Sequence, residues 1–467
     1  MDDSPNIILI FPDQWRGDCL GSLGHPALET PWLDGLSLDG ITFTRAYSPA
    51  PSCVPARACL ITGQTPSTTG RPGMEEGVPW RYPTTLMTCL RDGGYQTMLA
   101  GKTHFYPQMT TCGFEKMSQY EAKVLGDAPE CDYHTWLDRE TAGRVTDTSS
   151  TINRNSWLVH PWMADERLHP NTWTMDAALD LIERRDPLRP YFLQIGFNRP
   201  HPPIDPPWHT LHAYQNRPVP EPAIGAWSEM WSQQRLAGLP IPSPDQLANT
   251  RRAYYAQLNH IDQQIGRLIH HLKQSGQFQN TWLVFCSDHG EMLGDHHRFG
   301  KQVPLEGSSR VPLILQPPPG VDVNRGSQTD VPCTLSDLMP TLLDIAHVPV
   351  PDSVEGRSLV PVDEGAAQVA DRSFIHGEHA GAEGWQFVTD GKEKYFWESM
   401  SGREWFFDLD QDPQELNDLS VEAGNTDRIS LWRNRLIEIL AARPEDGLSD
   451  GRSLLPGRII PRTRPPG

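Results

Sequence analysis

The sequence predicts an α/β protein with a large, mostly parallel β-sheet flanked by helices, followed by a small C-terminal domain with an antiparallel sheet and one helix. Three observations lead to this fold class. Short apolar runs alternate with helix-like segments over about 350 residues, as in a parallel sheet covered on both faces. After residue 370 the runs take hairpin spacing instead. A chain of 467 residues also exceeds one ordinary core, so we expect two domains, 1–370 and 371–467.

The strands of the large sheet are predicted from apolar runs that end in polar residues. NIILIFPD delivers Asp13 at its carboxyl end, and YQTMLAGKTHF delivers Lys102 and His104. The remaining runs with this character are ITFTRAYS (41–48), PYFLQIGFNRPHPP (190–203), NTWLVFCSDHG (280–290) and RVPLILQ (310–316). Between the runs we expect helices at 30–40, 82–94, 172–185, 251–273 and 334–348.

The C-terminal segment differs in texture. Its aromatic-rich runs have hairpin spacing, with a turn at Asp390–Gly391, and an amphipathic helix follows at 427–443. The aromatic residues could form a carbohydrate platform, but packing within the domain's own sheet is the favoured interpretation for most of Trp385, Tyr395, Phe396, Trp397 and Trp405. The tail after 443 is polar and proline-rich, and we expect it to run extended over the surface.

Charge and composition exclude several classes of function. The formal net charge is −19 and no Lys/Arg run occurs, which argues against a nucleic-acid partner. We find no secretory signal and no apolar run near 18 residues, so no membrane segment is expected. The chain as given is expected to be cytoplasmic, or periplasmic or secreted if a signal was removed. Its eight cysteines form no CxxC pair and are expected to be mostly buried thiols.

Functional groups gather where the predicted strands end. Ligands of open α/β sheets bind beyond the carboxyl ends of the strands. The carboxylates, amide and imidazole expected there suit one divalent cation, and the lysines, arginine and histidines suit a tetrahedral oxyanion ester. The residues concerned are Asp13, Gln14, Lys102, His104, His201, Asp288 and His289, together with Cys53, Arg57 and Lys301 from nearby loops.

Cys53 lies in the segment SPAPSCVPARACLITGQTP. Pro55 disfavours helix at Val54, so we expect Cys53 in an extended turn just before a helix. Arg57 would then fall in the first helical turn, facing the same anion as the helix amino terminus. Cys59 is expected to point into the core.

These motifs together resemble the type I, formylglycine-dependent sulfatase family of the alkaline-phosphatase-like superfamily. The resemblance rests on C-V-P-A-R followed by T-G (53–63), and on the blocks NIILIFPDQWRGD, GYQTMLAGKTHF, NRPHPP, FCSDHGEMLGDH and EGSSRVPLIL in that order. It extends from residue 6 to about 420, where WFFDLDQDPQELNDL resembles the family's C-terminal ending. The resemblance implies an alkaline-phosphatase-like fold and hydrolysis of a sulfate ester, either a sulfated saccharide or a small aryl or alkyl sulfate.

The resemblance also implies roles for single residues. A maturation enzyme would oxidise Cys53 to formylglycine, whose hydrate attacks sulfur. Arg57 would hold this group, Lys102 and Lys301 would bind the sulfate oxygens, His104 would assist proton movement, and His201 or Lys301 would protonate the leaving oxygen. The metal would be held by Asp13, Gln14, Cys53, Asp288 and His289, with Ca²⁺ the first choice and Mn²⁺ or Mg²⁺ as alternatives.

Two positions depart from the most familiar sulfatase pattern. Many members have Asp-Asp where this chain has Asp13-Gln14, and Asp-Asn where it has Asp288-His289. These pairs also resemble choline sulfatases and the phosphonate monoester and phosphodiester hydrolases of the superfamily, which leaves phosphorus ester hydrolysis as the alternative function. A third hypothesis is a non-catalytic binding protein, or an enzyme left inert because Cys53 is never oxidised.

Substrate contacts are less well defined. In IHGEHA, His376, Glu378 and His379 are expected either to border the pocket or to be ordinary surface residues at a strand end. Pocket shape is assigned to loops at about 105–170 and 205–250, which are predicted to be irregular. The sequence leaves open whether the protein forms an oligomer.

Overall fold

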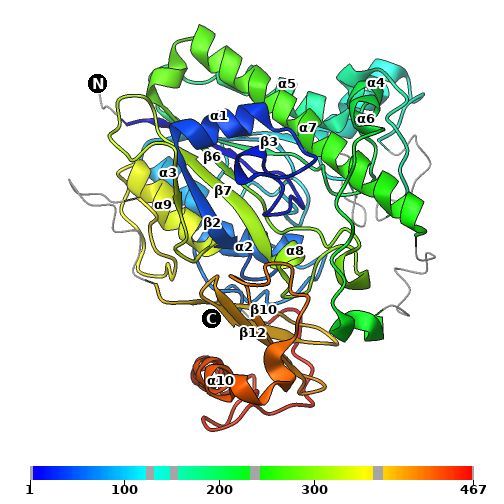
Figure 1. Ribbon diagram of the computed structural model, residues 1–467. Helices are drawn as coiled ribbons and strands as arrows, with labels where there is room; N and C mark the ends of the chain where they lie inside the picture. The colour runs from blue at the N-terminus through cyan, green and yellow to red at the C-terminus, as the bar shows by residue number, and fades with distance from the viewer. Residues whose placement is uncertain (1–3, 123–130, 148–155, 232–241, 361–371, 465–467) are drawn as a thin grey trace.

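The computed structural model describes residues 4–122, 131–147, 156–231, 242–360 and 372–464. Its architecture is a large mixed sheet between two layers of helices, with a small second sheet beside it (Figure 1). This confirms the predicted fold class. The predicted boundary at residue 370 lies outside the described residues, so the division into 1–370 and 371–467 stays a prediction.

The large sheet has nine strands among the described residues, and the apolar runs named from the sequence form six of them. Eight strands follow one another in the order β4 (Lys116–Gln119), β3 (Gln96–Gly101), β5 (Tyr191–Gly196), β1 (Asn6–Ile10), β6 (Thr281–Cys286), β7 (Arg310–Gln316), β2 (Ile41–Tyr47) and β8 (Ser327–Thr329). The short β9 (Cys333–Thr334) pairs with β2. Every pairing is parallel except those of β7, which runs antiparallel to both β6 and β2.

Helices cover both faces because the central strands bury side chains on both sides. In β1, Ile7 and Leu9 pack on one face, and Ile8 and Ile10 on the other. The first face is covered by α2 (Cys53–Thr62), α3 (Leu86–Asp92) and α9 (Leu338–Ile345). The second is covered by α1 (Pro31–Asp39), α5 (Pro170–Glu183) and α7 (Pro244–Gln274).

The longest helix starts earlier than its apolar periodicity indicates. The buried face of α7 includes Leu258, Ile261, Ile265, Leu268 and Leu272, as predicted. The helix begins at Pro244 rather than 251, because Ser243 and Gln246 form a capping box at a polar amino end. Periodicity alone cannot detect such polar first turns.

The connecting segments hold further short elements. The segments predicted to be irregular include β4, α4 (Asp132–Thr141) and α6 (Trp208–Tyr214), and α8 (Glu306–Ser309) precedes β7. Short 3-10 helices lie at η1 (Gly21–Leu23), η2 (Glu166–Leu168), η3 (Ala226–Trp231), η4 (Gln277–Asn280), η5 (Asp295–His297), η6 (Leu335–Asp337), η7 (Leu419–Val421) and η8 (Ala423–Asn425). Among the described residues, no helix combines the length and apolar character needed to span a bilayer.

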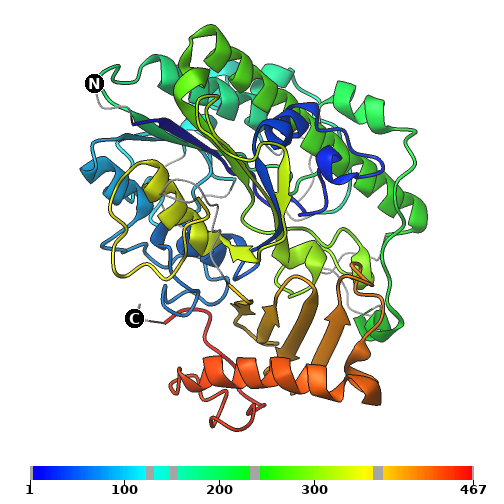
Figure 2. The ribbon, with the colours of Figure 1, turned by 60° about the vertical axis from the view of Figure 1, so that its left-hand side comes forward.

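The small sheet is antiparallel and carries one helix, as predicted. Its order is β10 (Ile375–His379), β11 (Trp385–Thr389), β12 (Glu393–Glu398) and β13 (Glu404–Asp408). The helix α10 (Thr426–Ala441) lies along the outer face (Figure 2). The five aromatic side chains considered as a carbohydrate platform are all buried, which confirms the packing interpretation. Tyr395 and Trp397 pack on the side of α10, while the other three form a cluster that also includes Tyr47 and Trp231 of the large domain.

The small sheet is joined directly to the large domain. The amide of Glu378 in β10 donates to the carbonyl of Pro49 at 2.8 Å, and His379 lies 3.0 Å from the hydroxyl of Ser52. Lys394 of β12 is fully buried and contacts Glu306, Glu415 and the carbonyl of Pro304. These contacts hold the segment before Cys53 and the segment at 304–306 against the small sheet.

Candidate active site

Cys53 is the first residue of α2, not a residue of a turn that precedes it. Ser52 is extended, with φ −160° and ψ 155°, and the helix starts immediately after it. The expectation of an extended turn at Cys53 was therefore wrong. Pro55 fits the first helical turn because an amide there has no intrahelical acceptor. The Cys53 thiol thus lies at the positive end of the helix, a location that favours anions.

Cys53 lies among the predicted metal ligands. Its Sγ is 3.5 and 3.6 Å from the two carboxylate oxygens of Asp13 and 3.1 Å from Nε2 of His289. One ligand atom from each of Asp13, Cys53, Asp288 and His289 can be chosen so that all four lie within 4.8 Å of one another, and all four residues are buried. Asp13 follows β1 and Asp288 follows β6, and these strands are neighbours in the sheet. Parallel pairing therefore brings the two carboxylates together.

Two cations neutralise these carboxylates. Arg57 contacts Asp288 through Nε at 3.1 Å and NH2 at 2.9 Å, while Lys102 pairs with Asp13. Burial would raise the pKa of Asp13, but Lys102, followed by Lys301, lowers it well below its usual value. Burial would lower the pKa of Lys102, but Asp13 raises it. Both groups are therefore charged at neutral pH.

His289 presents a free nitrogen lone pair to the cluster. Its Nδ1 lies 2.9 Å from the carbonyl oxygen of Gly290, which can only accept, so Nδ1 carries the proton. Burial is the main cause that lowers the pKa of this imidazole. Nε2 is therefore unprotonated and directed at Cys53, the arrangement found where a histidine binds a metal.

The other two predicted histidines differ in protonation. The His201 Nδ1 lies 2.8 Å from the Pro202 carbonyl, and burial, followed by Lys301, lowers its pKa well below the usual value. Burial and Lys102 would lower the pKa of His104, but its hydrogen bonds to Cys53 and Glu76 outweigh them and raise it. The structure therefore favours a neutral His201, with Nε2 as an acceptor, and a His104 that binds a proton more readily than an ordinary histidine.

Gln14 is held by a residue that sequence reasoning missed. Gln14 has a φ of 74°, and its backbone amide donates to Asp288 Oδ1 at 3.0 Å. Its side-chain amide donates to Glu291, which also accepts from the amides of Leu293 at 2.8 Å and Gly300 at 2.7 Å. The Gln14 carbonyl oxygen therefore accepts from Lys301. Glu291 stands two residues after His289 in the block FCSDHGEMLGDH. Its position just after a predicted strand is the feature of the sequence that could have identified it.

Comparisons with known proteins identify the family of this chain. A model of the sulfatase family matches residues 5–348, and a model of the C-terminal part of N-sulphoglucosamine sulphohydrolase matches 294–441. The chain belongs to the sulfatase family. It is accordingly a sulfuric ester hydrolase.

Individual relatives extend over nearly the whole sulfatase. An arylsulfatase of Clostridium perfringens is 38% identical and covers 97% of this chain and 98% of its own. An ulvan-active sulfatase of Formosa agariphila is 29% identical and covers 89% of this chain and 77% of its own. The solved structure of a phosphonate monoester hydrolase of Agrobacterium radiobacter is 26% identical, with a TM-score of 0.78 and coverage of 94% and 96%.

The small sheet brings His379, rather than His376, next to the sulfatase cluster. His379 lies beside Ser52, the residue before Cys53, and its pKa is lowered to about 3 by burial, Arg462 and His289. His376 hydrogen bonds to Gln386 within the small sheet. Its predicted role in substrate binding stays a prediction.

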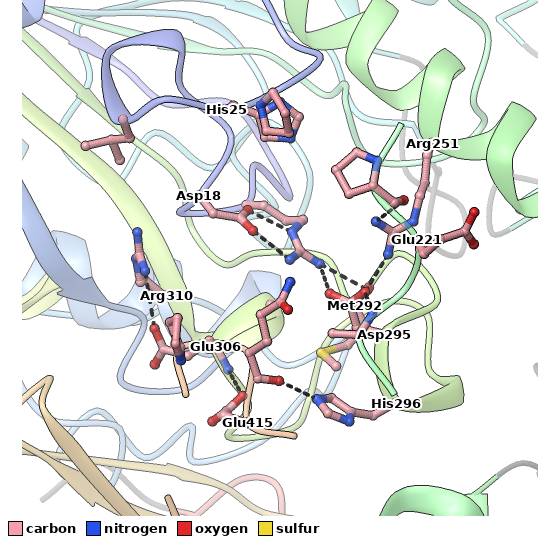
Figure 3. A pocket seen from close by; sticks show the side chains of 18 of the residues that line it. Asp18, His25, Glu221, Arg251, Met292, Asp295, His296, Glu306, Arg310 and Glu415 are labelled. Carbon is pink, nitrogen blue, oxygen red and sulfur yellow. Dashed lines mark hydrogen bonds and ion pairs between the residues drawn. The ribbon is translucent and has the colours of Figure 1, made fainter. Parts of the chain in front are cut away.

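A cavity of about 520 Å³ lies apart from the catalytic cluster (Figure 3). Among its lining residues are none of Asp13, Cys53, Asp288 and His289. Its charged walls are internally paired, by Arg16 with Asp18, Arg251 with Asp295, and Arg310 with Glu306.

Proposed function

We propose that this sulfatase hydrolyses the sulfate ester of a saccharide or of a small aryl or alkyl alcohol, with a formylglycine made from Cys53 and one divalent metal. The observation that carries the proposal is the position of the Cys53 thiol. It lies at the amino end of α2, in contact with Asp13 and His289, with Arg57 and Lys102 on the adjoining carboxylates. This arrangement joins a nucleophile position, a cation site and anion-binding groups.

The donor set fits a divalent cation. Asp13 and Asp288 supply carboxylates, His289 an unprotonated Nε2 and Gln14 an amide oxygen, while position 53 completes the set. Oxygen donors suit Ca²⁺, our first choice, as well as Mg²⁺ and Mn²⁺, and the His289 nitrogen suits Mn²⁺ better than Ca²⁺. A metal bound here would act as a Lewis acid on the reacting oxygens. Formylglycine would supply a hydrated aldehyde whose hydroxyl is the nucleophile, and making it requires a maturation enzyme as partner.

The chain's own residues divide the remaining work. Lys102 and Lys301 border the cluster from opposite sides, on Asp13 and Gln14, where both can hold sulfate oxygens. Arg57 stabilises negative charge at position 53. His104 can exchange a proton with that position, since the proximity of Cys53 and Glu76 raises the pKa of its imidazole. The neutral His201 is the weaker proton donor, so Lys301 is the favoured acid for the leaving oxygen.

Phosphonate monoester or phosphodiester hydrolysis is the second candidate. It is favoured by Gln14 and His289 in place of a carboxylate and an amide, and by the similarity to the phosphonate monoester hydrolase structure. A saccharide sulfate as substrate is supported by the names of relatives such as the ulvan-active sulfatase. A panel of aryl sulfate, aryl phosphonate, phosphodiester and defined sulfated saccharides separates these functions. Faster turnover of phosphorus esters than of every sulfate ester would reject the first function in favour of the second.

Mass spectrometry of the peptide containing residue 53 tests the mechanism. Conversion of Cys53 to formylglycine lowers the mass by about 18 Da. Cys53→Ala should reduce turnover at least a thousandfold or so, because the nucleophile is lost. Cys59→Ala, in the same helix but buried in the core, is the matched control and should retain turnover. Full activity of Cys53→Ala would rule out the covalent mechanism.

A further inference from the structure

The C-terminal tail returns to the large domain and encloses a small pocket there. The Arg464 amide donates to the Gly70 carbonyl at 2.9 Å, and the Gly73 amide donates to the Arg462 carbonyl at 3.1 Å. Between the tail and the loop at 69–82 lies a pocket of about 290 Å³. We call it the arginine pocket, after Arg71, Arg81 and Arg464 in its lining.

Among the described residues, the lining of the arginine pocket contains three guanidinium groups and no carboxylate. This differs from the larger cavity of Figure 3, where each arginine is paired with an acid. The positive charge of the arginine pocket also contrasts with the net charge of −19 for the chain as a whole. A local excess of positive charge on an acidic protein creates a place where anions gather.

Arg71 is the central feature of the pocket. It is only 4% exposed, and its side chain pairs with no carboxylate in the described part of the chain. Its Nε donates to the Tyr82 hydroxyl at 2.9 Å, and NH2 donates to the carbonyls of Val78 and Pro79. Its NH1 has no hydrogen-bond partner. A buried charge without a counterion is costly, so an anion bound beside Arg71 would stabilise the folded protein.

The other two arginines add to this excess. Arg81 is exposed, and no contact joins it to an acid of the described residues. Arg464 pairs with Asp446 through NH1, but its Nε and NH2 have no hydrogen-bond partners. Arg71 alone could be explained as a clip for the loop at 78–82. A role in holding the loop does not explain why Arg71 NH1 is without a hydrogen-bond partner among the described residues. It also does not explain why Arg81 and Arg464 line the same pocket.

The loop that lines the arginine pocket also contacts the catalytic site. Glu76, between Arg71 and Arg81 in sequence, lies 3.7 Å from Nε2 of His104. The Trp80 ring packs against Phe105 with centroids 4.7 Å apart, and Arg71 stacks on the same Trp80 ring. A substrate bound at His104 would therefore contact the loop at 69–82, which also lines the arginine pocket.

We propose that the arginine pocket is a second anion-binding site, which holds a tetrahedral oxyanion such as a sulfate group through Arg71, Arg81 and Arg464. Guanidinium groups match the oxygens of such anions with paired N–H donors. The anion is either free sulfate or a second sulfate group on the substrate. The substrate-borne source rests on the proposed function, whereas the anion site itself does not.

Titration calorimetry tests the proposal in the Cys53→Ala background, where no ester is turned over. The probes are sodium sulfate, a disulfated disaccharide and its monosulfated counterpart. Arg81→Ala is the test variant, because Arg81 is exposed and its replacement leaves the fold intact. Arg91→Ala is the matched control, with the same charge change on an exposed arginine of α3 outside the pocket. Diffraction from crystals soaked in selenate should show an anomalous peak among the three arginines.

The expected result is about tenfold weaker anion binding in Arg81→Ala and unchanged binding in Arg91→Ala. Selective weakening of the disulfated disaccharide identifies the substrate as the source, and weakening of sodium sulfate alone identifies free sulfate. Unchanged affinity for all three probes, or no selenate peak in the pocket, overturns the proposal. Failure of the proposed function would appear elsewhere, as absence of sulfate ester turnover by the unsubstituted protein.

Discussion

Replacing Glu291 by glutamine should turn the Gln14 amide around. Glu291 is fully buried and accepts three N–H groups, from Gln14, Leu293 and Gly300. In Glu291→Gln one oxygen remains for the two backbone amides. The new NH₂ group then meets the NH₂ group of Gln14. Two donors cannot bond, so Gln14 rotates and directs its NH₂ group at Lys301 and the metal position.

The size of the effect follows from these contacts. Burial raises the pKa of Glu291 to about 7, so the carboxylate is charged above that pH. There a hydrogen bond to a charged group contributes about 1.5–3 kcal/mol, and the variant loses one such bond. It also loses the Gln14 oxygen as a metal ligand and places two donors, Gln14 NH₂ and Lys301, against each other. Loss of a residue that orients a ligand typically lowers metal affinity about 10–100-fold. We expect Glu291→Gln to lower metal affinity about 10–100-fold without changing the residue at position 53.

Competition with a chromogenic chelator measures this affinity directly for Ca²⁺ and Mn²⁺. Glu221→Gln is the matched control, because Glu221 is exposed, lines the separate cavity of Figure 3 and undergoes the same change of charge. Thermal unfolding with and without metal gives a second readout that does not depend on turnover. Equal metal affinity in Glu291→Gln and the unsubstituted protein would refute the reasoning.

Two further predictions concern stability. Lys394→Met removes the cation shared by Glu306 and Glu415. Glu306 keeps Arg310 as a partner, whereas Glu415 stays buried without a cation. Urea unfolding should therefore show a loss of about 3–5 kcal/mol, and a loss below about 1 kcal/mol would contradict a structural role. Asp262 accepts a hydrogen bond from the Leu33 amide at the start of α1. Burial raises the pKa of this carboxyl group to about 7. The folded chain therefore retains a proton that the unfolded chain releases. This contribution is complete below about pH 4 and is lost as the pH rises to about 7. Asp262→Asn should flatten the fall in stability over this range, and identical pH profiles would disprove the assignment.

The elements predicted correctly are those whose determinants are local. The runs around Ile8 and Leu283 are apolar on both faces, which marks a buried strand wherever its neighbours lie. Polar residues directly after such runs, as at Asp13 and Asp288, must reach the carboxyl edge of a parallel sheet. That is why the carboxylates and His289 could be grouped from sequence, although their roles rested on family resemblance.

What sequence reasoning missed depends on distant partners. The antiparallel direction of β7 is determined by the path of the chain from α8, since RVPLILQ would suit either direction. Glu291 is recognisable only once Gln14 is seen beside it. The arginine pocket joins Arg71 to Arg464, whose positions in sequence give no sign of contact.

The contacts of β10 with the segment before Cys53 have a consequence for biosynthesis. Glu378 and His379 cover Pro49 and Ser52, yet they leave the ribosome about 300 residues later. At about 5–20 residues per second this delay lasts roughly 15–60 s. The segment with Cys53 therefore emerges long before the strand that closes over it exists. Under the proposed function, a maturation enzyme would reach Cys53 during synthesis, and a completed chain that folds with an unmodified thiol would exclude that enzyme.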